Sequence, residues 1–343
     1  MKAVVTKGDG TVQVADVPTP VIQDPRDVIV RVTAAAVCGT DLHFIQLPIL
    51  SPTTPLGHEF IGEVYEVGSA VDGLVVGQRV MSRMFVSCGH CVACQIGRQP
   101  QCPEYLLFGG TGSGGGELAG GQAEYVRVPC ADRTLTPAVQ GLTDADALLL
   151  TDTLPTAWAA VTETGAPAGK SFAVVGAGPV GQQVVAVAYA LGAAVVYAVD
   201  LDEGRLAKAA ALGAIPVQGS TAAGERIFEL AGTGVDVAVD AVGSQAAINT
   251  CMKAVSVGGR LAIVGAILAG EVTFAAPELL HKSVQIQPIM GNPYASEHLM
   301  IALLVSKRLS LTGLIDAEVP LADAVGAYAD FAARKVNKIV LVP

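Results

Sequence analysis

Hydrophobic and polar residues alternate differently in the two parts of this chain. Up to about residue 128, short stretches such as DVIVRVTAAAV and GEVYEVGSAV are separated by glycine and proline, which predicts a β-rich, barrel-like domain. From about residue 156, β-branched runs such as SFAVV and AVVYAVD alternate with helical runs rich in alanine and leucine. This second pattern is typical of a doubly wound parallel sheet with crossover helices, so we expect an α/β protein with two domains.

We place the domain boundary between residues 153 and 154. The β-rich domain is expected at 1–153 and the doubly wound domain at 154–291. The remaining segment, 292–343, contains two helical stretches and a final strand, KIVLVP, which could complete either domain. A stretch from 109 to 121, in which eight of thirteen residues are glycine, predicts a mobile surface loop.

The amino-acid composition of the chain limits the kinds of ligand that we expect it to bind. Hydrophobic residues make up 51% and charged residues 15% of the 343 positions, which excludes a disordered chain. The formal net charge is −10 with no block of lysine and arginine, so we expect neither nucleic acid nor a membrane as a partner. No signal peptide or membrane-spanning pattern occurs, and we expect a cytoplasmic protein that acts on small molecules.

Four of the seven cysteines follow one another closely, with the spacing C-x2-C-x2-C-x7-C. They are Cys88, Cys91, Cys94 and Cys102, within a predicted lobe at 86–104. Four thiolates at this spacing can surround one tetrahedral zinc ion and leave no open position. The pattern therefore predicts a structural zinc site.

A second metal site is predicted from Cys38 and His58. A catalytic zinc needs three protein ligands and one open position, so a third ligand is required. Asp152 is the best candidate, because it follows an apolar run just before the pattern changes. Two alternatives stay open at this point: Cys38 and His58 could be packing residues, and Asp152 could cap the helix that starts near Pro155.

A glycine-rich turn marks the start of the doubly wound domain. Its sequence is Gly176-Ala-Gly178-Pro179-Val180-Gly181, between a strand and a helix, and Asp200 ends the next strand. This combination predicts a dinucleotide site, with the pyrophosphate at the helix N-terminus and Asp200 on the ribose hydroxyls. Because Asp202 and Glu203 follow Asp200, a 2′-phosphate would be repelled, and we expect NAD(H) rather than NADP.

With these motifs in this order, the chain resembles the zinc-containing medium-chain alcohol dehydrogenases along essentially its whole length. The resemblance implies a GroES-like catalytic domain, to which 292–343 returns, and a Rossmann domain. It also implies two zinc ions per chain, one structural and one catalytic, with Cys38, His58 and Asp152 as the catalytic ligands. Further roles are implied for four residues: Thr40 and His43 as a proton relay, Asp41 as the partner of His58, and Glu59 as a carboxylate that can approach the metal.

Two positions depart from the commonest family pattern. Many members carry cysteine where this chain has Asp152, and the aspartate is closer to bacterial secondary alcohol dehydrogenases and to the formaldehyde dehydrogenase-like branch. Gly39 lies where some members have a basic residue that contacts the cofactor pyrophosphate. We therefore expect Lys338, just before the last strand, to supply that positive charge.

The implied activity is reversible hydride transfer between an alcohol and NAD(H), which gives a ketone or an aldehyde. The residues after His43, FIQLPILSPTTPL, contain no acid or base, which favours a small or medium hydrophobic secondary alcohol over a polyol, a sugar or formaldehyde. A zinc-free reductase of the quinone type is disfavoured because such proteins lack these ligands, whereas a non-catalytic dinucleotide-binding sensor stays open. The resemblance also implies a homodimer or homotetramer.

Overall fold

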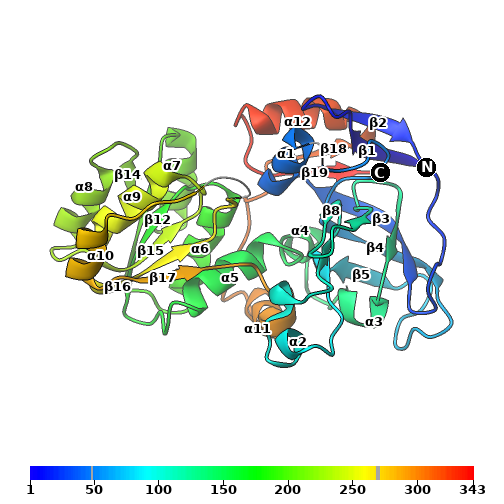
Figure 1. The fold of residues 1–343 in the computed structure, drawn as a ribbon, viewed down its shortest axis with the longest axis horizontal. Coiled ribbons are helices and arrows are strands. Elements are labelled where there is room, and N and C mark those ends of the chain that lie inside the picture. The colour runs from blue at the N-terminus through cyan, green and yellow to red at the C-terminus, as the bar shows by residue number, and fades with distance from the viewer. Residues whose placement is uncertain (48, 268–270) are drawn as a thin grey trace. The chain divides into compact units, whose positions relative to one another are not determined.

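The structure is a computed structural model, and it describes residues 1–47, 49–267 and 271–343. The chain divides into two compact units, coloured along the chain in Figure 1. Unit 1 comprises Met1–Asp152, Asn292–Val305 and Thr312–Pro343, and unit 2 comprises Thr153–Gly291 and Ser306–Leu311. The stretch Ser306–Leu311 thus differs from the expectation that all of 292–343 returns to the first domain. Its side chains Leu309 and Leu311 are buried, which fixes the stretch in place.

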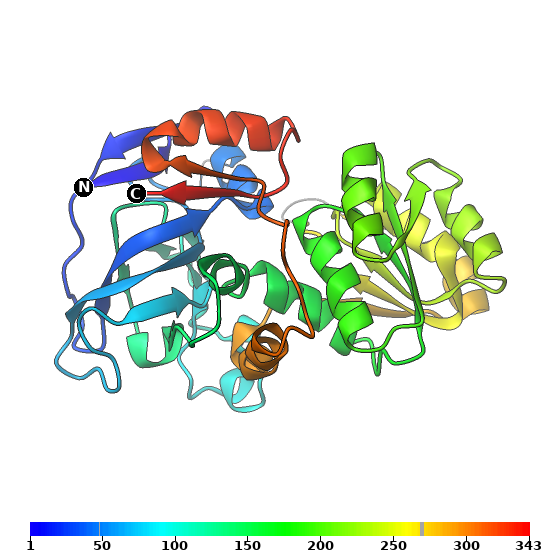
Figure 2. The ribbon, with the colours of Figure 1, turned by 180° about the vertical axis from the view of Figure 1, so that it is seen from behind.

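A mixed sheet forms the centre of unit 1. Its strand order is β11-β5-β4-β3-β19-β18, with β10 paired to β3. The bounds of these strands are β3 (Val28–Ala36), β4 (Glu59–Val67), β5 (Arg79–Ser82), β10 (Tyr125–Val128), β11 (Leu135–Pro137), β18 (Ala317–Pro320) and β19 (Ile339–Val342). The C-terminal strand β19 lies beside β3 (Figure 2), and in their antiparallel pairing Leu341 is opposite Ala35. This pairing brings the end of the chain next to its first third.

Shorter elements complete unit 1. The paired strands outside the main sheet are β1 (Lys2–Thr6) with β2 (Val12–Asp16), β6 (Phe85–Val86) with β7 (Leu106–Leu107), and β8 (Gly110–Thr111) with β9 (Glu117–Leu118). The helices are α1 (Gly39–Gln46), α2 (Val92–Gln95), η1 (Gln99–Gln101), α3 (Ala131–Thr134), α4 (Asp144–Leu149), α11 (Pro293–Val305), η2 (Leu321–Asp323) and α12 (Ala324–Ala332). Apolar side chains of the sheet and of several of these elements form two buried clusters.

Two details of unit 1 differ from the sequence prediction. Helix α1 interrupts the region predicted to be entirely β, because Cys38 and Asp41 form a capping box that starts a helix directly after β3. The glycine-rich stretch 109–121 is also no simple surface loop. A Cβ on Gly120 would lie 2.3 Å from the carbonyl oxygen of Gly57, so the absence of side chains lets this segment pack closely against the chain that leads to His58.

Unit 2 contains a parallel sheet of order β14-β13-β12-β15-β16-β17 among its described residues. The strands are β12 (Ser171–Val175), β13 (Val195–Asp200), β14 (Ile215–Gln218), β15 (Val235–Asp240), β16 (Val255–Ile263) and β17 (Gln285–Pro288). The helices are α5 (Thr153–Thr162), α6 (Pro179–Ala190), α7 (Glu203–Ala211), α8 (Ala223–Leu230), α9 (Gln245–Ala254) and α10 (Ala276–Lys282). The predicted α/β architecture with a doubly wound sheet is therefore confirmed.

Within the described ranges, no helix combines the length and the apolar character that crossing a membrane requires.

Candidate metal centres and cofactor turn

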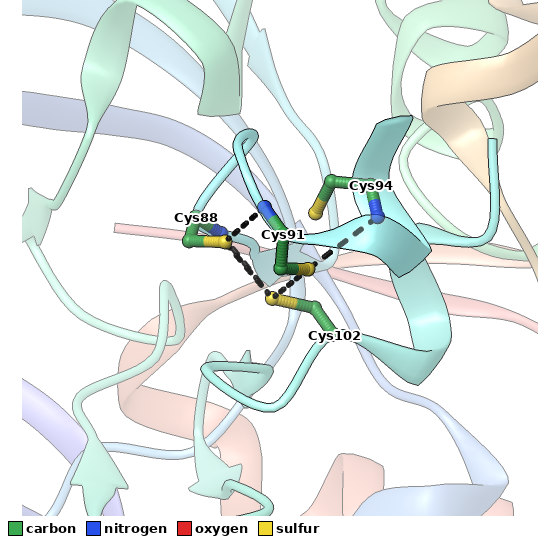
Figure 3. A group of neighbouring side chains, drawn as sticks. All are labelled: Cys88, Cys91, Cys94 and Cys102. Carbon is green, nitrogen blue, oxygen red and sulfur yellow. Dashed lines mark hydrogen bonds between the residues drawn. The ribbon is translucent and has the colours of Figure 1, made fainter. Parts of the chain in front are cut away.

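The four lobe cysteines lie around a common point (Figure 3). The sulfur of Cys102 is 3.6 Å from that of Cys88 and 3.8 Å from that of Cys91. Sulfur ligands bound at about 2.3 Å to one tetrahedral ion lie about 3.8 Å apart, so this spacing fits a zinc ion. All four cysteines are free thiols, and nothing links them as disulfides. A closed set of four sulfurs fits a structural ion.

Backbone N–H groups already point at these sulfurs. Cys91 precedes α2, and its sulfur accepts from the N–H of Cys94 at 3.5 Å. This bond lowers the pKa of the Cys91 thiol to about 7, which favours the thiolate that zinc requires. The N–H of Gly89 donates to the Cys94 sulfur at 3.3 Å, and the positive φ of Gly89 gives the tight turn this needs. His90 is exposed and lies outside the group of four.

The second group consists of Cys38, His58, Glu59 and Asp152, whose ligand atoms lie within 4.8 Å of one another. Cys38 follows β3, His58 directly precedes β4, and Asp152 lies between α4 and α5. Asp152 Oδ2 is 3.2 Å from His58 Nε2 and 3.6 Å from Cys38 Sγ. Ligands 2.0–2.3 Å from a shared tetrahedral ion would be separated by about 3.3–3.8 Å, so these residues fit zinc.

The electrostatics of this group favour a positive charge at its centre. Burial alone would lower the pKa of His58, but the Cys38 sulfur and the carboxyl groups of Asp152 and Asp41 outweigh burial and hold it well above its usual range. Burial also opposes ionisation of Asp152, yet its contact with His58 keeps the pKa of Asp152 low. A zinc ion would satisfy the same buried anions.

Glu59 is paired with Lys338. Both side chains are buried, and Lys338 Nζ lies 2.5 Å from Glu59 Oε1 and 3.3 Å from the carbonyl oxygen of Val37. Burial raises the pKa of Glu59 to about 7, although the ammonium of Lys338 opposes the rise. The placement of Lys338 differs from its expected contact with the cofactor pyrophosphate, because the buried carboxylate binds its ammonium group.

Asp41 connects the ligands to residues that sequence reasoning missed. Its Oδ1 lies 3.4 Å from His58 Nδ1, and its Oδ2 accepts from the backbone N–H of Cys38 at 3.0 Å. Gln122 and Tyr328 also contact Oδ2, at 3.1 and 3.3 Å. No sequence motif marks these two residues, which lie far from Asp41 along the chain.

Thr40 and His43 occupy one face of α1. They are three residues apart, which places their side chains next to each other on a helix. Both side chains are partly exposed, so this face of α1 is accessible to solvent.

The glycine turn of unit 2 has the shape that a dinucleotide requires. Gly176 has φ +97°, and a Cβ on Gly181 would lie 1.8 Å from the Gly176 carbonyl oxygen, so both positions need glycine. The atom nearest to a Cβ on Gly178 would be Arg205 Nη1, at 3.9 Å, and Pro179 and Val180 begin α6. Asp200 lies at the end of β13, where its carboxylate accepts from the N–H of Ala177 at 2.8 Å. The turn thus leaves the N-terminus of α6 accessible to phosphate.

Comparison with known proteins defines the class. Residues 24–138 match the family model of the alcohol dehydrogenase GroES-like domain, and residues 179–306 match that of the zinc-binding dehydrogenases. A probable zinc-binding alcohol dehydrogenase of Mycobacterium tuberculosis is 37% identical over 99% of this chain and 87% of its own length. The chain therefore belongs to the zinc-containing medium-chain alcohol dehydrogenase family, and it is an oxidoreductase.

Relatives of this chain differ in substrate and cofactor. The structure of alcohol dehydrogenase TADH from Thermus sp. ATN1 is similar with a TM-score of 0.93, 34% identity, and coverage of 100% of this chain and 99% of the other. A glutathione-independent formaldehyde dehydrogenase of Pseudomonas aeruginosa is 32% identical over 100% of this chain and 97% of its own length. A zinc-binding dehydrogenase from Sinorhizobium meliloti, at 26% identity, a TM-score of 0.87 and coverage of 100% and 99%, is bound to NADP.

Proposed function

We propose that the chain oxidises an alcohol reversibly to its carbonyl compound with NAD, at a catalytic zinc ion held by Cys38, His58 and Asp152. The observation that carries this proposal is the approach of one Asp152 oxygen to both His58 Nε2 and Cys38 Sγ, at 3.2 and 3.6 Å. Three donors leave a fourth tetrahedral position for substrate. A second ion belongs to the four-cysteine lobe and supports its fold.

The chain's own residues then handle the proton. Zinc supplies a Lewis acid that makes the alcohol hydroxyl more acidic. Oxidation of the alcohol would release a hydride, for which bound NAD would be the acceptor, and a proton, which must reach solvent. Thr40 accepts this proton at its hydroxyl, and the imidazole of His43 passes it outward from the same face of α1. Asp41 Oδ1 lies 3.4 Å from His58 Nδ1, and this contact would orient the ring so that Nε2 is available to the metal.

Glu59 is proposed as a reserve ligand. Its Oε1 is bound to Lys338, but its buried Oε2 has no hydrogen-bond partner among the described residues. That oxygen can approach the metal when the ligand set rearranges. In this proposal Lys338 neutralises Glu59 rather than the cofactor pyrophosphate.

NAD is the proposed cofactor. Asp200 at the end of β13 and the acidic residues Asp202 and Glu203 put negative charge where a 2′-phosphate would bind. Kinetics with both cofactors test this choice: kcat/KM should be higher with NAD than with NADP, and the reverse ranking would refute the assignment.

A small or medium hydrophobic secondary alcohol is the proposed substrate. Its support is the uncharged segment that follows His43, although Phe44, Ile45, Leu50 and Leu56 lie in the core rather than at a surface. A panel of secondary alcohols, primary alcohols, polyols and formaldehyde, followed by NADH absorbance, tests the proposal. Faster turnover of polyols or formaldehyde would reassign the substrate. Turnover in a protein that contains no zinc would favour a zinc-free reductase.

Location and assembly complete the proposal. We infer a cytoplasmic homodimer or homotetramer, supported by free thiols at all seven cysteines and by the family to which the chain belongs. Light scattering during size-exclusion chromatography measures the assembly, and a monomeric mass would contradict it.

A further inference from the structure

A buried hydrogen-bond network joins three distant parts of unit 1 behind the Cys38 and His58 side chains. Asp41 comes from α1, Gln122 follows the glycine-rich stretch, and Tyr328 lies in α12. All three side chains are buried, Asp41 and Gln122 fully and Tyr328 with 4% of its surface exposed. Buried polar groups are costly unless they form hydrogen bonds. The hydrogen bonds among these three side chains therefore determine how each one is oriented.

The Asp41 carboxylate touches both metal-site segments. Oδ2 accepts from the backbone N–H of Cys38 at 3.0 Å, which fixes the start of α1, and Oδ1 faces His58 Nδ1 at 3.4 Å. Rotation of this carboxylate would therefore disturb the orientation of Cys38 and His58 together. Whatever holds Asp41 in place also holds both proposed ligands.

Gln122 holds Asp41 only in one of its two amide orientations. Its Nε2 donates to Asp41 Oδ2 and to the carbonyl oxygen of Ala36, both at 3.1 Å. If the amide were flipped, its oxygen would face these two acceptors and both bonds would be lost. The carboxylate of Asp41 and the carbonyl group of Ala36 therefore fix the orientation of the amide.

Tyr328 supports this orientation of the amide. Its hydroxyl donates to Gln122 Oε1 at 2.7 Å, which is shorter than its 3.3 Å contact with Asp41 Oδ2. A hydroxyl has one proton, and the shorter contact takes it, so this bond adds to the preference for the amide oxygen at that position. Tyr328 thus acts on Asp41 through the orientation of Gln122.

The backbone next to His58 leaves room for this arrangement. Gly57 has φ +94°, and a Cβ on it would lie 2.4 Å from Gln122 Cγ. The residue immediately before His58 must therefore lack a side chain for Gln122 to reach Asp41.

We propose that Gln122 and Tyr328 are positioning residues of the metal site, because together they fix the Asp41 carboxylate that orients Cys38 and His58. This role rests on the proposed catalytic zinc. Neither residue touches substrate or metal, and their contribution is to keep the two ligands in the geometry that binds the ion.

The test compares Tyr328→Phe with a matched control, Tyr294→Phe. The hydroxyl of Tyr294 donates to the carbonyl oxygen of Phe85 at 2.8 Å, so each substitution removes a bonded hydroxyl group in unit 1 and keeps the ring. Metal retention is measured against a graded series of chelator, and the visible spectrum is recorded after exchange with Co²⁺ alone. Tyr328→Phe should lose the catalytic ion about tenfold more readily and shift the cobalt spectrum, while Tyr294→Phe should match the parent protein. Equal retention and spectra in the two variants would overturn the proposal.

Substitutions of Gln122 give a second readout that does not depend on the folding of Tyr328→Phe. Gln122→Met removes the amide at similar size and should also weaken metal retention. Gln122→Glu keeps an acceptor for Tyr328 but places a second carboxylate against Asp41, so it should weaken retention further. Parental retention in both variants would also overturn the proposal.

Cys38→Ser separates this inference from the proposed function. A cobalt spectrum that is unchanged in Cys38→Ser would mean that the metal does not bind at this cluster, and the proposed function would fail. A spectrum that depends on Cys38 but responds to neither Tyr328 nor Gln122 would reject the positioning role alone.

Discussion

Lys338 and Glu59 illustrate how much depends on one buried pair. Their charged atoms are 2.5 Å apart, and both side chains are buried. Removing one partner of a buried ion pair leaves the other charge unsatisfied, which costs about 3–5 kcal/mol. Lys338→Met should therefore lower stability by that amount, measured as the free energy of unfolding in urea.

A double substitution checks the cause. Lys338→Met combined with Glu59→Gln should recover much of the loss, because no uncompensated charge remains. Lys2→Met is the control, since it removes the exposed pair with Asp16 and should leave the urea midpoint nearly unchanged. No recovery in the double variant would show that the charge of Glu59 is not what Lys338 compensates.

Asp200 and its neighbour Leu201 allow a test of cofactor choice. Asp202 caps α7 by accepting from the N–H of Arg205, so it should be left in place. Leu201 is 70% exposed and can be replaced without loss of core packing. Asp200→Ser combined with Leu201→Arg should lower the ratio of kcat/KM for NAD to that for NADP at least about tenfold, because it removes the ribose acceptor and adds a phosphate partner. If the ratio in the double variant equals the ratio in Leu201→Arg alone, Asp200 does not determine the preference for NAD over NADP.

The turn before α6 is the element on which cofactor binding depends. A Cβ on Gly181 would lie 1.8 Å from a backbone oxygen, so Gly181→Ala should force the turn open and cost about 1–3 kcal/mol. We also expect weaker NADH binding, measured by fluorescence titration. Gly326→Ala is the control, because a Cβ there meets nothing within 4 Å in α12 and alanine favours a helix. Unchanged NADH affinity in Gly181→Ala would contradict this account of the turn.

The four-cysteine lobe should behave as a separately stabilised element. Cys94→Ser removes one of four sulfurs, and we expect zinc content to fall by about one ion per chain. The lobe should then open locally and become sensitive to protease between residues 86 and 104, while folded molecules keep some turnover. Zinc content equal to that of the parent protein would remove this site.

At the scale of the whole molecule, the sequence predicts those features whose signal is local. The lobe cysteines, the glycine turn and the alternation of strands and helices in unit 2 each lie within a short window, so spacing and periodicity reveal them. Helix α1 was missed because its start depends on a capping box at Cys38 rather than on a long helical pattern.

Contacts across long sequence separations could not be predicted in the same way. The carboxylate of Asp41 meets Tyr328, which is 287 residues away, and Lys338 meets Glu59 across 279 residues. Only the pairing of β19 with β3 and the packing of α12 bring these residues together. Lys338 was consequently assigned to the cofactor, since its buried partner was not visible in the sequence.

The central claim is that Asp152 is a ligand of a catalytic zinc ion, and one comparison tests it most directly. Zinc per chain and NAD-dependent turnover are measured for the parent protein, Asp152→Asn and the control Asp132→Asn, which alters an exposed pair with Arg26. Asparagine can still cap a helix but presents a neutral oxygen to the metal. We predict about two zinc ions in the parent and in the control, about one in Asp152→Asn, and turnover lowered at least about a hundredfold in that variant. Two retained ions with parental turnover in Asp152→Asn would contradict the account.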